Sequence, residues 1–294
     1  MPRFDHGLEN RLDSVMAERR SKDIIDKAYQ KALAEIAENR AIEPRAFTKF
    51  NYDPAIIEED LRYVEVMEKK FKQDERPEFA EQQKLATILV VIMQTQIEMN
   101  DWMGPDVTTK QASRYDDIKN GIDTICEFEQ ESGVQHLALA LDITSSWNPT
   151  KKLSRIKEEI DAGKLSTVKY FESSDETFHG TLQLVPRVVI GAERKAIVEL
   201  AELWLNKKNK ELASHPIQLQ ILNEIVHQLK AFMNYAEKKG KTNVAAIYNR
   251  SLRLIDHIRS SSDKIALASK HKSVDYATND TVYANIIDGL SIFR

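Results

Sequence analysis

Cysteine, glycine and proline are scarce in this chain, and each shortage restricts the class of protein. The single cysteine, Cys126, excludes an internal disulfide and a cysteine-based zinc site, and it fits a reducing compartment. Only 9 glycines and 8 prolines occur among 294 residues, whereas alanine, leucine, isoleucine, glutamate and lysine are frequent. This composition favours helix over much of the length.

The chain also lacks a long apolar run and a strong net charge. Its longest apolar run, 85–93, is far shorter than the roughly 20 residues that a membrane helix needs. The first residues, MPRFDHGLENRLD, lack the apolar centre of a secretory signal. A formal net charge of −4 gives no overall attraction to nucleic acid. We therefore expect a cytoplasmic protein with no membrane partner.

Three common catalytic motifs are missing from the sequence. There is no HExxH motif, no GxSxG motif and no GxxxxGK[ST] phosphate loop, and no two histidines are four positions apart. These absences count against a zinc protease, an α/β-hydrolase and a P-loop NTPase.

Hydrophobic periodicity and chain-breaking residues predict four segments. They are an N-terminal helical segment (1–78), an α/β core (79–192), a helical bundle packed on the core (193–262) and a tail (263–294). The interrupted apolar stripe of the first helix suits packing or self-association, so a homo-oligomer through the N-terminal helices is a candidate assembly. The core and the start of the bundle contain predicted helices at 79–102, 149–162 and 193–212, and predicted strands at 122–128, 136–144, 166–172 and 181–190.

Two of these strands each carry one aspartate where an apolar residue would be the easier choice. If the hairpin loop is centred between Ser132 and Gly133, Asp142 lies directly opposite Asp123. Directly opposed residues have Cβ atoms about 4.5–5.5 Å apart, and two like charges held there repel. A hard cation converts that repulsion into a binding site. The sequence thus predicts a Mg²⁺ (or Mn²⁺) site at Asp123 and Asp142, and an Asp142→Asn change is expected to stabilise the metal-free protein.

Further acidic residues occur close to this pair. Glu98, near the end of helix 79–102, is either a solvated or ion-paired residue or a further metal ligand. Asp116 and Asp117 fit either turn chemistry or an outer metal shell, and Asp117 is included as a candidate ligand.

The strand at 136–144 has two different faces. Leucines and an isoleucine occupy one face, whereas Ala138 and Ala140 leave the other face small. We expect a helix to pack closely on the alanines, with Asp142 and Thr144 side by side at the rim.

The order helix, GIDTICEFE, hairpin loop, HLALALDIT, helix, STVKYFES, LQLVPRVVIG, helix resembles the restriction-endonuclease-like, or PD-(D/E)xK, superfamily. Over about 98–191, the resemblance implies an α/β (α+β) fold. Its small mixed β-sheet is flanked here by extensive N- and C-terminal α-helices. It also implies an enzyme that hydrolyses phosphodiester bonds of DNA or RNA, with Asp123 and Asp142 holding the metal.

The resemblance departs from the superfamily at one catalytic position. A lysine is expected two residues after the second acid, where this chain has Thr144, which carries no charge. Some members of the superfamily supply the lysine from a neighbouring element. On that basis Lys152 is the candidate catalytic lysine, and Lys151 and Lys169 are candidate nucleic-acid contacts. Alternatively, these lysines form an ordinary surface, and the chain is a non-catalytic interaction or scaffold protein that retains an inactive nuclease-like core.

Overall fold

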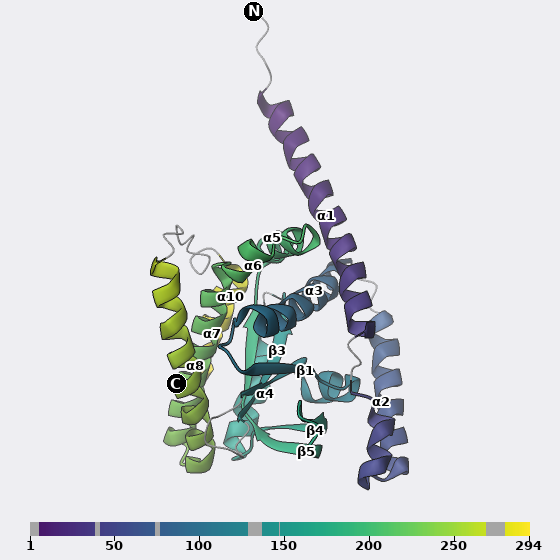
Figure 1. Cartoon of the computed structure of the whole chain (residues 1–294), viewed down its shortest axis with the longest axis vertical. Coiled ribbons are helices and arrows are strands. Elements are labelled where there is room, and N and C mark those ends of the chain that lie inside the picture. The colour runs from purple at the N-terminus through teal and green to yellow at the C-terminus, as the bar shows by residue number, and fades with distance from the viewer. Residues whose placement is uncertain (1–5, 39–41, 74–76, 129–136, 147, 269–279) are drawn as a thin grey trace, which may run out of the picture.

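The computed structural model describes residues 6–38, 42–73, 77–128, 137–146, 148–268 and 280–294. It shows a mixed α/β protein in which helices surround a small mixed sheet (Figure 1). The helical elements are α1 (His6–Glu38), η1 (Pro44–Phe50), α2 (Pro54–Lys72), α3 (Pro77–Asn100), η2 (Asp116–Asn120), α4 (Thr150–Asp161), α5 (Arg194–Leu205), α6 (Asn209–Ala213), α7 (Ile217–Lys238), α8 (Thr242–Ala268), α10 (Thr281–Gly289) and η3 (Leu290–Phe293).

The strands form two sheets. The central sheet has the order β1-β2-β3-β6, and a separate two-stranded sheet pairs β4 with β5. Strand β2 runs antiparallel to both β1 and β3, whereas β6 is parallel to β3. The bounds are β1 (Val107–Gln111), β2 (Thr124–Phe128), β3 (Leu137–Thr144), β4 (Ser166–Glu172), β5 (His179–Val185) and β6 (Arg187–Gly191).

The register between β2 and β3 is the one that the sequence predicted. Thr124 pairs with Leu141, and the pairing continues to Phe128 and Leu137. Asp123 lies immediately before this paired segment, and Asp142 directly follows Leu141 on β3. The predicted loop centre itself lies in 129–136, outside the described residues.

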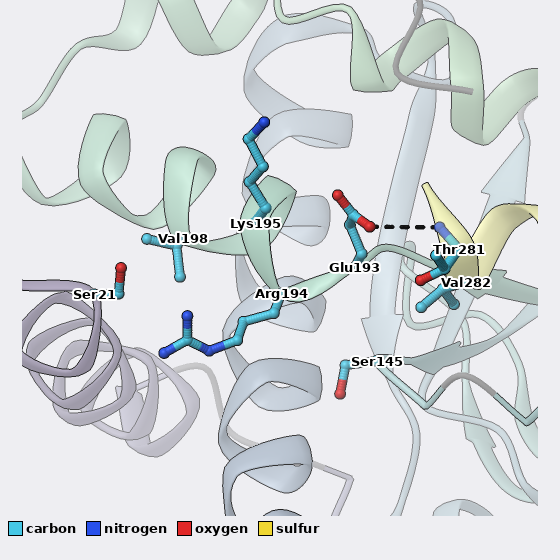
Figure 2. Close-up of a pocket in the computed structure, with 8 residues that line it drawn as sticks. All are labelled: Ser21, Ser145, Glu193, Arg194, Lys195, Val198, Thr281 and Val282. Atoms are coloured by element: carbon cyan, nitrogen blue, oxygen red, sulfur yellow. Dashed lines mark hydrogen bonds between the residues drawn. The ribbon is translucent and has the colours of Figure 1, made fainter. Parts of the chain in front are cut away.

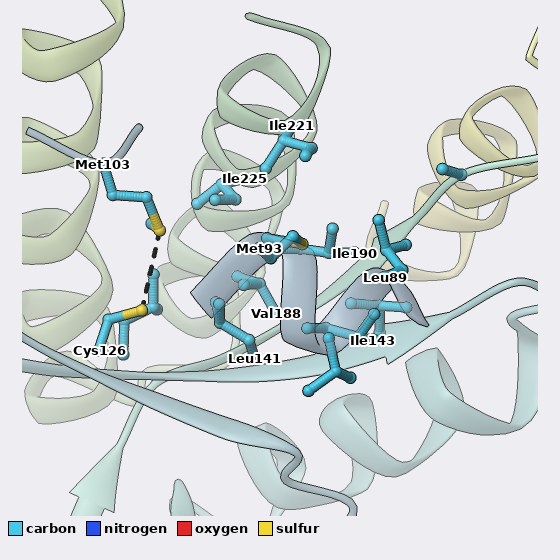
Figure 3. Packing of buried hydrophobic residues seen from close by; sticks show 14 of the residues in the cluster. Leu89, Met93, Met103, Cys126, Leu141, Ile143, Val188, Ile190, Ile221 and Ile225 are labelled. Atoms are coloured by element: carbon cyan, nitrogen blue, oxygen red, sulfur yellow. Dashed lines mark hydrogen bonds between the residues drawn. The ribbon is translucent and has the colours of Figure 1, made fainter. Parts of the chain in front are cut away.

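A hydrophobic core covers one face of the central sheet. Apolar side chains of α3 and α7 meet those of β3 and β6 (Figure 3), and the Cys126 thiol lies 3.8 Å from the Met103 sulfur. This core also includes residues of α1, α5, α8 and α10, so it extends across all four predicted segments. Residues labelled in Figure 3 include Leu89, Met93, Leu141, Ile143, Val188, Ile190, Ile221 and Ile225.

The opposite face of the sheet is covered differently from what was predicted. A helix was expected on the alanines of β3, but Ala140 packs in a second cluster with Val168, Phe171 and Val185. Those three residues belong to β4 and β5. A small side chain permits close approach by any apolar surface, and here that surface is a two-stranded sheet.

The predicted strand 181–190 is two strands. Residues up to Val185 form β5 in the small sheet, and β6 begins at Arg187 in the central sheet. Pro186 separates them and has no N–H to donate, although its carbonyl accepts a hydrogen bond from the Ala140 N–H at 2.9 Å. Strand β6 is at an edge of the central sheet, and the Gln228 side chain hydrogen-bonds both the N–H and the carbonyl of Val189.

Two more regions differ from the prediction. Residues 107–120, where no element was predicted, contain strand β1 and the single π-helical turn η2. The predicted helix 193–212 is interrupted between α5 and α6, where Lys207 adopts a positive φ of 54°.

Helix α1 packs on α3 and α5 through its C-terminal half, and its N-terminal half extends beyond the rest of the molecule (Figure 1). Among the described residues, no helix is both long enough and apolar enough to cross a membrane.

Candidate functional site

Asp123 and Asp142 lie at the same end of the β2–β3 pair. Asp142 shares a face of β3 with Ala140, because side chains on a strand alternate. The Asp123 N–H donates at 2.9 Å to the carbonyl of Leu141, the residue that pairs with Thr124, so the ladder is irregular at Asp123. The Asp123 carboxylate accepts the Ile143 N–H at 2.6 Å, and this bond fixes it beside β3.

Lys152 joins this pair from the first turn of α4. Its ammonium group donates a hydrogen bond to Oδ1 of Asp142, a side chain that is only 6% exposed, and it lies 3.5 Å from the Ile143 carbonyl oxygen. Thr144 does not replace it, because its hydroxyl accepts the Ser146 N–H at 3.0 Å and the residue is buried. The structure therefore brings together the two predicted acids and the lysine predicted to have moved.

Asp117 approaches the cluster from η2. Its carboxylate is ion-paired with Arg114, which also donates to Glu68 on α2 at 2.8 Å. Burial raises the pKa of Asp117, the Arg114 guanidinium opposes the rise, and the Asp142 carboxylate adds to it.

Burial and neighbouring charges raise the pKa values of both Asp123 and Lys152. Burial and the nearby charge of Asp117 raise the pKa of Asp123 to about 8, with Lys152 opposing and Asp142 adding to the rise. Burial alone would lower the pKa of Lys152, but the carboxylates of Asp142 and Asp123 raise it overall. Lys152 is therefore charged at neutral pH, whereas Asp123 is largely protonated unless another cation is present.

The donor atoms fit a small hard cation held by two carboxylates. Among the described residues, no hydrogen bond reaches Oδ1 of Asp123 or Oδ2 of Asp142, so each carboxylate keeps one oxygen available. Mg²⁺ is commonly held by one or two carboxylates, with water and phosphate oxygens completing its shell. Within the described ranges, no three acidic, histidine or cysteine side chains are grouped closely enough to hold a metal by themselves.

The structure does not bring Glu98 to this cluster. Its carboxylate accepts hydrogen bonds from the backbone N–H and the hydroxyl of Thr109 on β1. Thr109 pairs with Cys126, three positions along β2 from Asp123, and residues an odd number apart point to opposite faces of a strand. Glu98 is exposed, which matches the alternative of a solvated residue.

The two predicted nucleic-acid contacts differ in their surroundings. Lys151 is exposed beside Lys152. Lys169 is ion-paired with Asp60 on α2, and its ammonium lies 5.1 Å from the centre of the Tyr115 ring. It therefore ties β4 to α2 rather than to the acidic pair.

Asp116, the neighbour of Asp117, has a structural role. Its carboxylate accepts the backbone N–H groups of Lys169 and Tyr170 at 2.7 and 3.1 Å. It also accepts bonds from Ser113 and Asn120 at 2.7 and 2.6 Å, so Asp116 attaches η2 to β4.

Two arginines beside the cluster were missed by the sequence analysis. Arg187 is 1% exposed and donates to the Asn120 carbonyl at 2.6 Å and to Glu159 at 3.1 Å. Arg155 on α4 donates to the Lys119 carbonyl. A charged residue within the apolar run LVPRVVIG was a signal for Arg187, and the spacing of three residues from Lys152 placed Arg155 on the same side of the helix.

Comparisons of the chain with protein-family models, with curated proteins and with solved structures find no match.

Gly121 lies next to the two arginines and to Asp142. A Cβ added there would lie 2.9 Å from a terminal nitrogen of Arg187, 3.2 Å from one of Arg155 and 3.4 Å from Oδ2 of Asp142. The residue also has a φ of 65°, which non-glycine residues rarely adopt.

A Gly121→Ala change is expected to destabilise the protein more than Gly240→Ala. Gly240 has a similar φ of 68° but nothing within 4 Å of an added Cβ, so it reports the backbone cost alone, about 1–2 kcal/mol. Displacing Arg187 should add roughly 1 kcal/mol or more at Gly121. Denaturant unfolding of both variants measures the difference, and equal losses would contradict the crowding.

A pocket of about 430 Å³ lies elsewhere, between α1, the N-terminus of α5 and α10 (Figure 2). Arg194 extends into this region and is ion-paired with Glu18 and Glu81. None of the predicted site residues lines this pocket, so it is separate from the acidic cluster.

Proposed function

We propose that this chain is a metal-dependent nuclease-like phosphodiesterase that acts on DNA or RNA. One observation carries the proposal: Asp123, just before β2, and Asp142 on β3 lie at the same end of the paired strands, with Lys152 bound to Asp142. Each carboxylate also retains an oxygen without a hydrogen-bond donor among the described residues. Acids on adjacent strands with an available lysine are the groups that metal-assisted phosphodiester hydrolysis uses.

The chain order supports a restriction-endonuclease-like core. Helix α3, strands β2 and β3, helix α4, strands β4 and β6 and helix α5 occur in the order of the resemblance, with β1 and η2 inserted after α3 and β5 after β4. Asp123 immediately precedes β2, and Asp142 lies near the end of β3. Lys152 on α4 contacts Asp142, which supports the hypothesis of a displaced lysine.

The two aspartates and Lys152 would have different roles in hydrolysis. Mg²⁺ or Mn²⁺ held by Asp123 and Asp142 would supply a water of lowered pKa and neutralise charge on the phosphate. Because the pKa of Lys152 is raised, its ammonium acts at neutral pH as a charge and hydrogen-bond donor, rather than as a base. It orients Asp142 and can stabilise negative charge that develops on the substrate.

Asp123→Asn is the sharpest test of this function. Cleavage of labelled single- and double-stranded DNA and RNA is expected with Mg²⁺ or Mn²⁺ and not with chelator. The variant should reduce the rate by at least about 100-fold, because a metal ligand contributes several kcal/mol. It should also be more stable than wild type at pH 8, so a loss of activity cannot come from unfolding. If wild-type protein does not cleave, or if the variant cleaves equally well, the proposal is wrong.

A non-catalytic scaffold is the second candidate function, and helix α1 favours it. Residues 13–20 of that helix are exposed at every described position, including Val15 at 66% and Met16 at 69%. An exposed helix with apolar side chains suits association with another chain, including a second copy. The absence of metal-dependent cleavage would leave this function as the remaining candidate.

A further inference from the structure

Two guanidinium groups and one carboxylate surround a single point beside the acidic pair. Terminal nitrogens of Arg155 and Arg187 and Oδ2 of Asp142 all lie within 3.4 Å of the position that a Cβ of Gly121 would occupy. The absence of a side chain at Gly121 makes this convergence possible. Like charges so close together need compensation from anions.

The two arginines differ in how fully their donors are used. Arg187 is buried, and it is held by the carbonyl of Asn120 and by Glu159. Arg155 has a side chain that is 39% exposed, and only one of its terminal nitrogens, Nη2, donates, to Lys119. Among the described residues, Nη1 of Arg155 has no hydrogen-bond acceptor. Arg155 is therefore the guanidinium that a ligand can reach.

The two arginines of this cluster share one carboxylate. Glu159 lies 3.1 Å from Nη2 of Arg187 and 3.8 Å from Nε of Arg155, whereas the Asp142 carboxylate is ion-paired with Lys152. The exposed guanidinium of the two is that of Arg155, and its Nη1 keeps its donor capacity. An anion is therefore the ligand that fits beside Arg155.

We propose that Arg155 is a substrate-binding residue that holds a phosphate of the nucleic-acid backbone next to the Asp123–Asp142 pair. A guanidinium matches the planar spacing of phosphate oxygens and can bind two of them at once. Arg187 is a positioning residue, because its hydrogen bond to the Asn120 carbonyl fixes the loop at Gly121. Arg155 lies beside that loop. This inference rests on the proposed function, and it names a phosphodiester as the ligand of that site.

Salt-dependent binding tests the role of Arg155 separately from cleavage. Labelled duplex DNA, single-stranded DNA and RNA of one sequence are titrated with protein in chelator, so that no hydrolysis occurs. Arg155→Gln is expected to weaken binding roughly 10-fold. The slope of log affinity against log salt should fall by about 0.9 on duplex and about 0.7 on single strands, because one phosphate contact is lost.

Two further variants sharpen the comparison. Arg155→Lys keeps the charge but loses the planar set of N–H donors of the guanidinium. It should therefore retain the salt slope and bind with intermediate affinity. Arg259→Gln is the matched control, since Arg259 is 31% exposed on α8 and is bonded to Asp256. It should leave both the affinity and the slope unchanged. Thermal melting verifies that each variant is folded.

The outcomes separate this inference from the proposed function. If wild type cleaves in Mn²⁺ but Arg155→Gln binds as Arg259→Gln does, the phosphate contact is wrong and the nuclease function survives. If no cleavage occurs but Arg155→Gln alone loses binding and slope, the phosphate contact is supported and the enzyme function is wrong. Failure of wild type to bind any of the three nucleic acids overturns the inference.

Discussion

Replacing Lys152 with methionine is expected to lower the free energy of unfolding by about 2–4 kcal/mol at neutral pH. The Asp142 side chain is 6% exposed, and Lys152 is the cation that its carboxylate contacts. Methionine preserves most of the length of the side chain but leaves a buried carboxylate without its partner. Desolvation of that carboxylate, rather than lost packing, causes the expected destabilisation.

A double-mutant cycle measures this coupling directly. Combining Lys152→Met with Asp142→Asn removes both charges, so the double variant should be less destabilised than the two single changes added together. Lys151→Met, on the exposed neighbouring residue, is the control and should change stability by less than about 0.5 kcal/mol. Simple additivity would show that the ion pair does not contribute. Cleavage should also be lost in Lys152→Met if the proposed function is correct.

The ion pair with Lys152 also reverses one expectation from the sequence. With two aspartates alone, Asp142→Asn was expected to stabilise the metal-free protein by relieving repulsion. Since Asp142 neutralises Lys152, that change is now expected to be destabilising, and the gain is expected at Asp123 instead.

Asp123→Asn should produce a stability difference from wild type that grows as pH rises. The pKa of Asp123 is about 8 in the folded protein, against 3.8 for an ordinary aspartate. Between these values the folded state keeps a proton that the unfolded state has released, so wild-type stability falls with increasing pH. One such group changes the free energy of unfolding by at most about 1.4 kcal/mol per pH unit. Asparagine cannot ionise and is free of this penalty.

Denaturant unfolding at pH 5 and pH 8 measures the effect. The advantage of Asp123→Asn should increase by about 3–4 kcal/mol between the two values, without added metal. Saturating Mn²⁺ should shrink the pH dependence of wild type, because a bound cation favours the ionised carboxylate. Asp23→Asn, on the exposed surface of α1, is the control and should show no such trend. Parallel pH profiles for wild type and Asp123→Asn would contradict the raised pKa.

Local sequence signals determined several elements and one feature of the site. Asp53 caps the N-terminus of α2, where its carboxylate accepts the Ala55 N–H at 2.8 Å, and Pro54 is the first helical residue. The alternation along β3 and the loop centre between Ser132 and Gly133 predicted the β2–β3 register, in which Thr124 pairs with Leu141. Register follows from such patterns because a shift of one residue would turn every apolar side chain to the wrong face.

Other features depended on packing between segments far apart in sequence. The apolar run 181–190 reads as continuous, and only the two different partners of β5 and β6 divide it at Pro186. Arg155 looks like an ordinary cation in sequence, and the sequence alone does not pair Lys152 or Arg187 with an acid. Their meeting with Asp142 depends on the orientation of α4 and on the path of the loop at Gly121.

The sequence by itself therefore determined the helices with clear caps, the β2–β3 register and the presence of two acids at one end of that strand pair, because these follow from periodicity and neighbouring residues. Only the tertiary structure decided which cations neutralise those acids, which surface covers the alanine face and where Glu98 and Lys169 lie. The sequence position of a charged or small side chain does not identify the residue that it contacts. These partners are therefore set by the packing of the whole molecule.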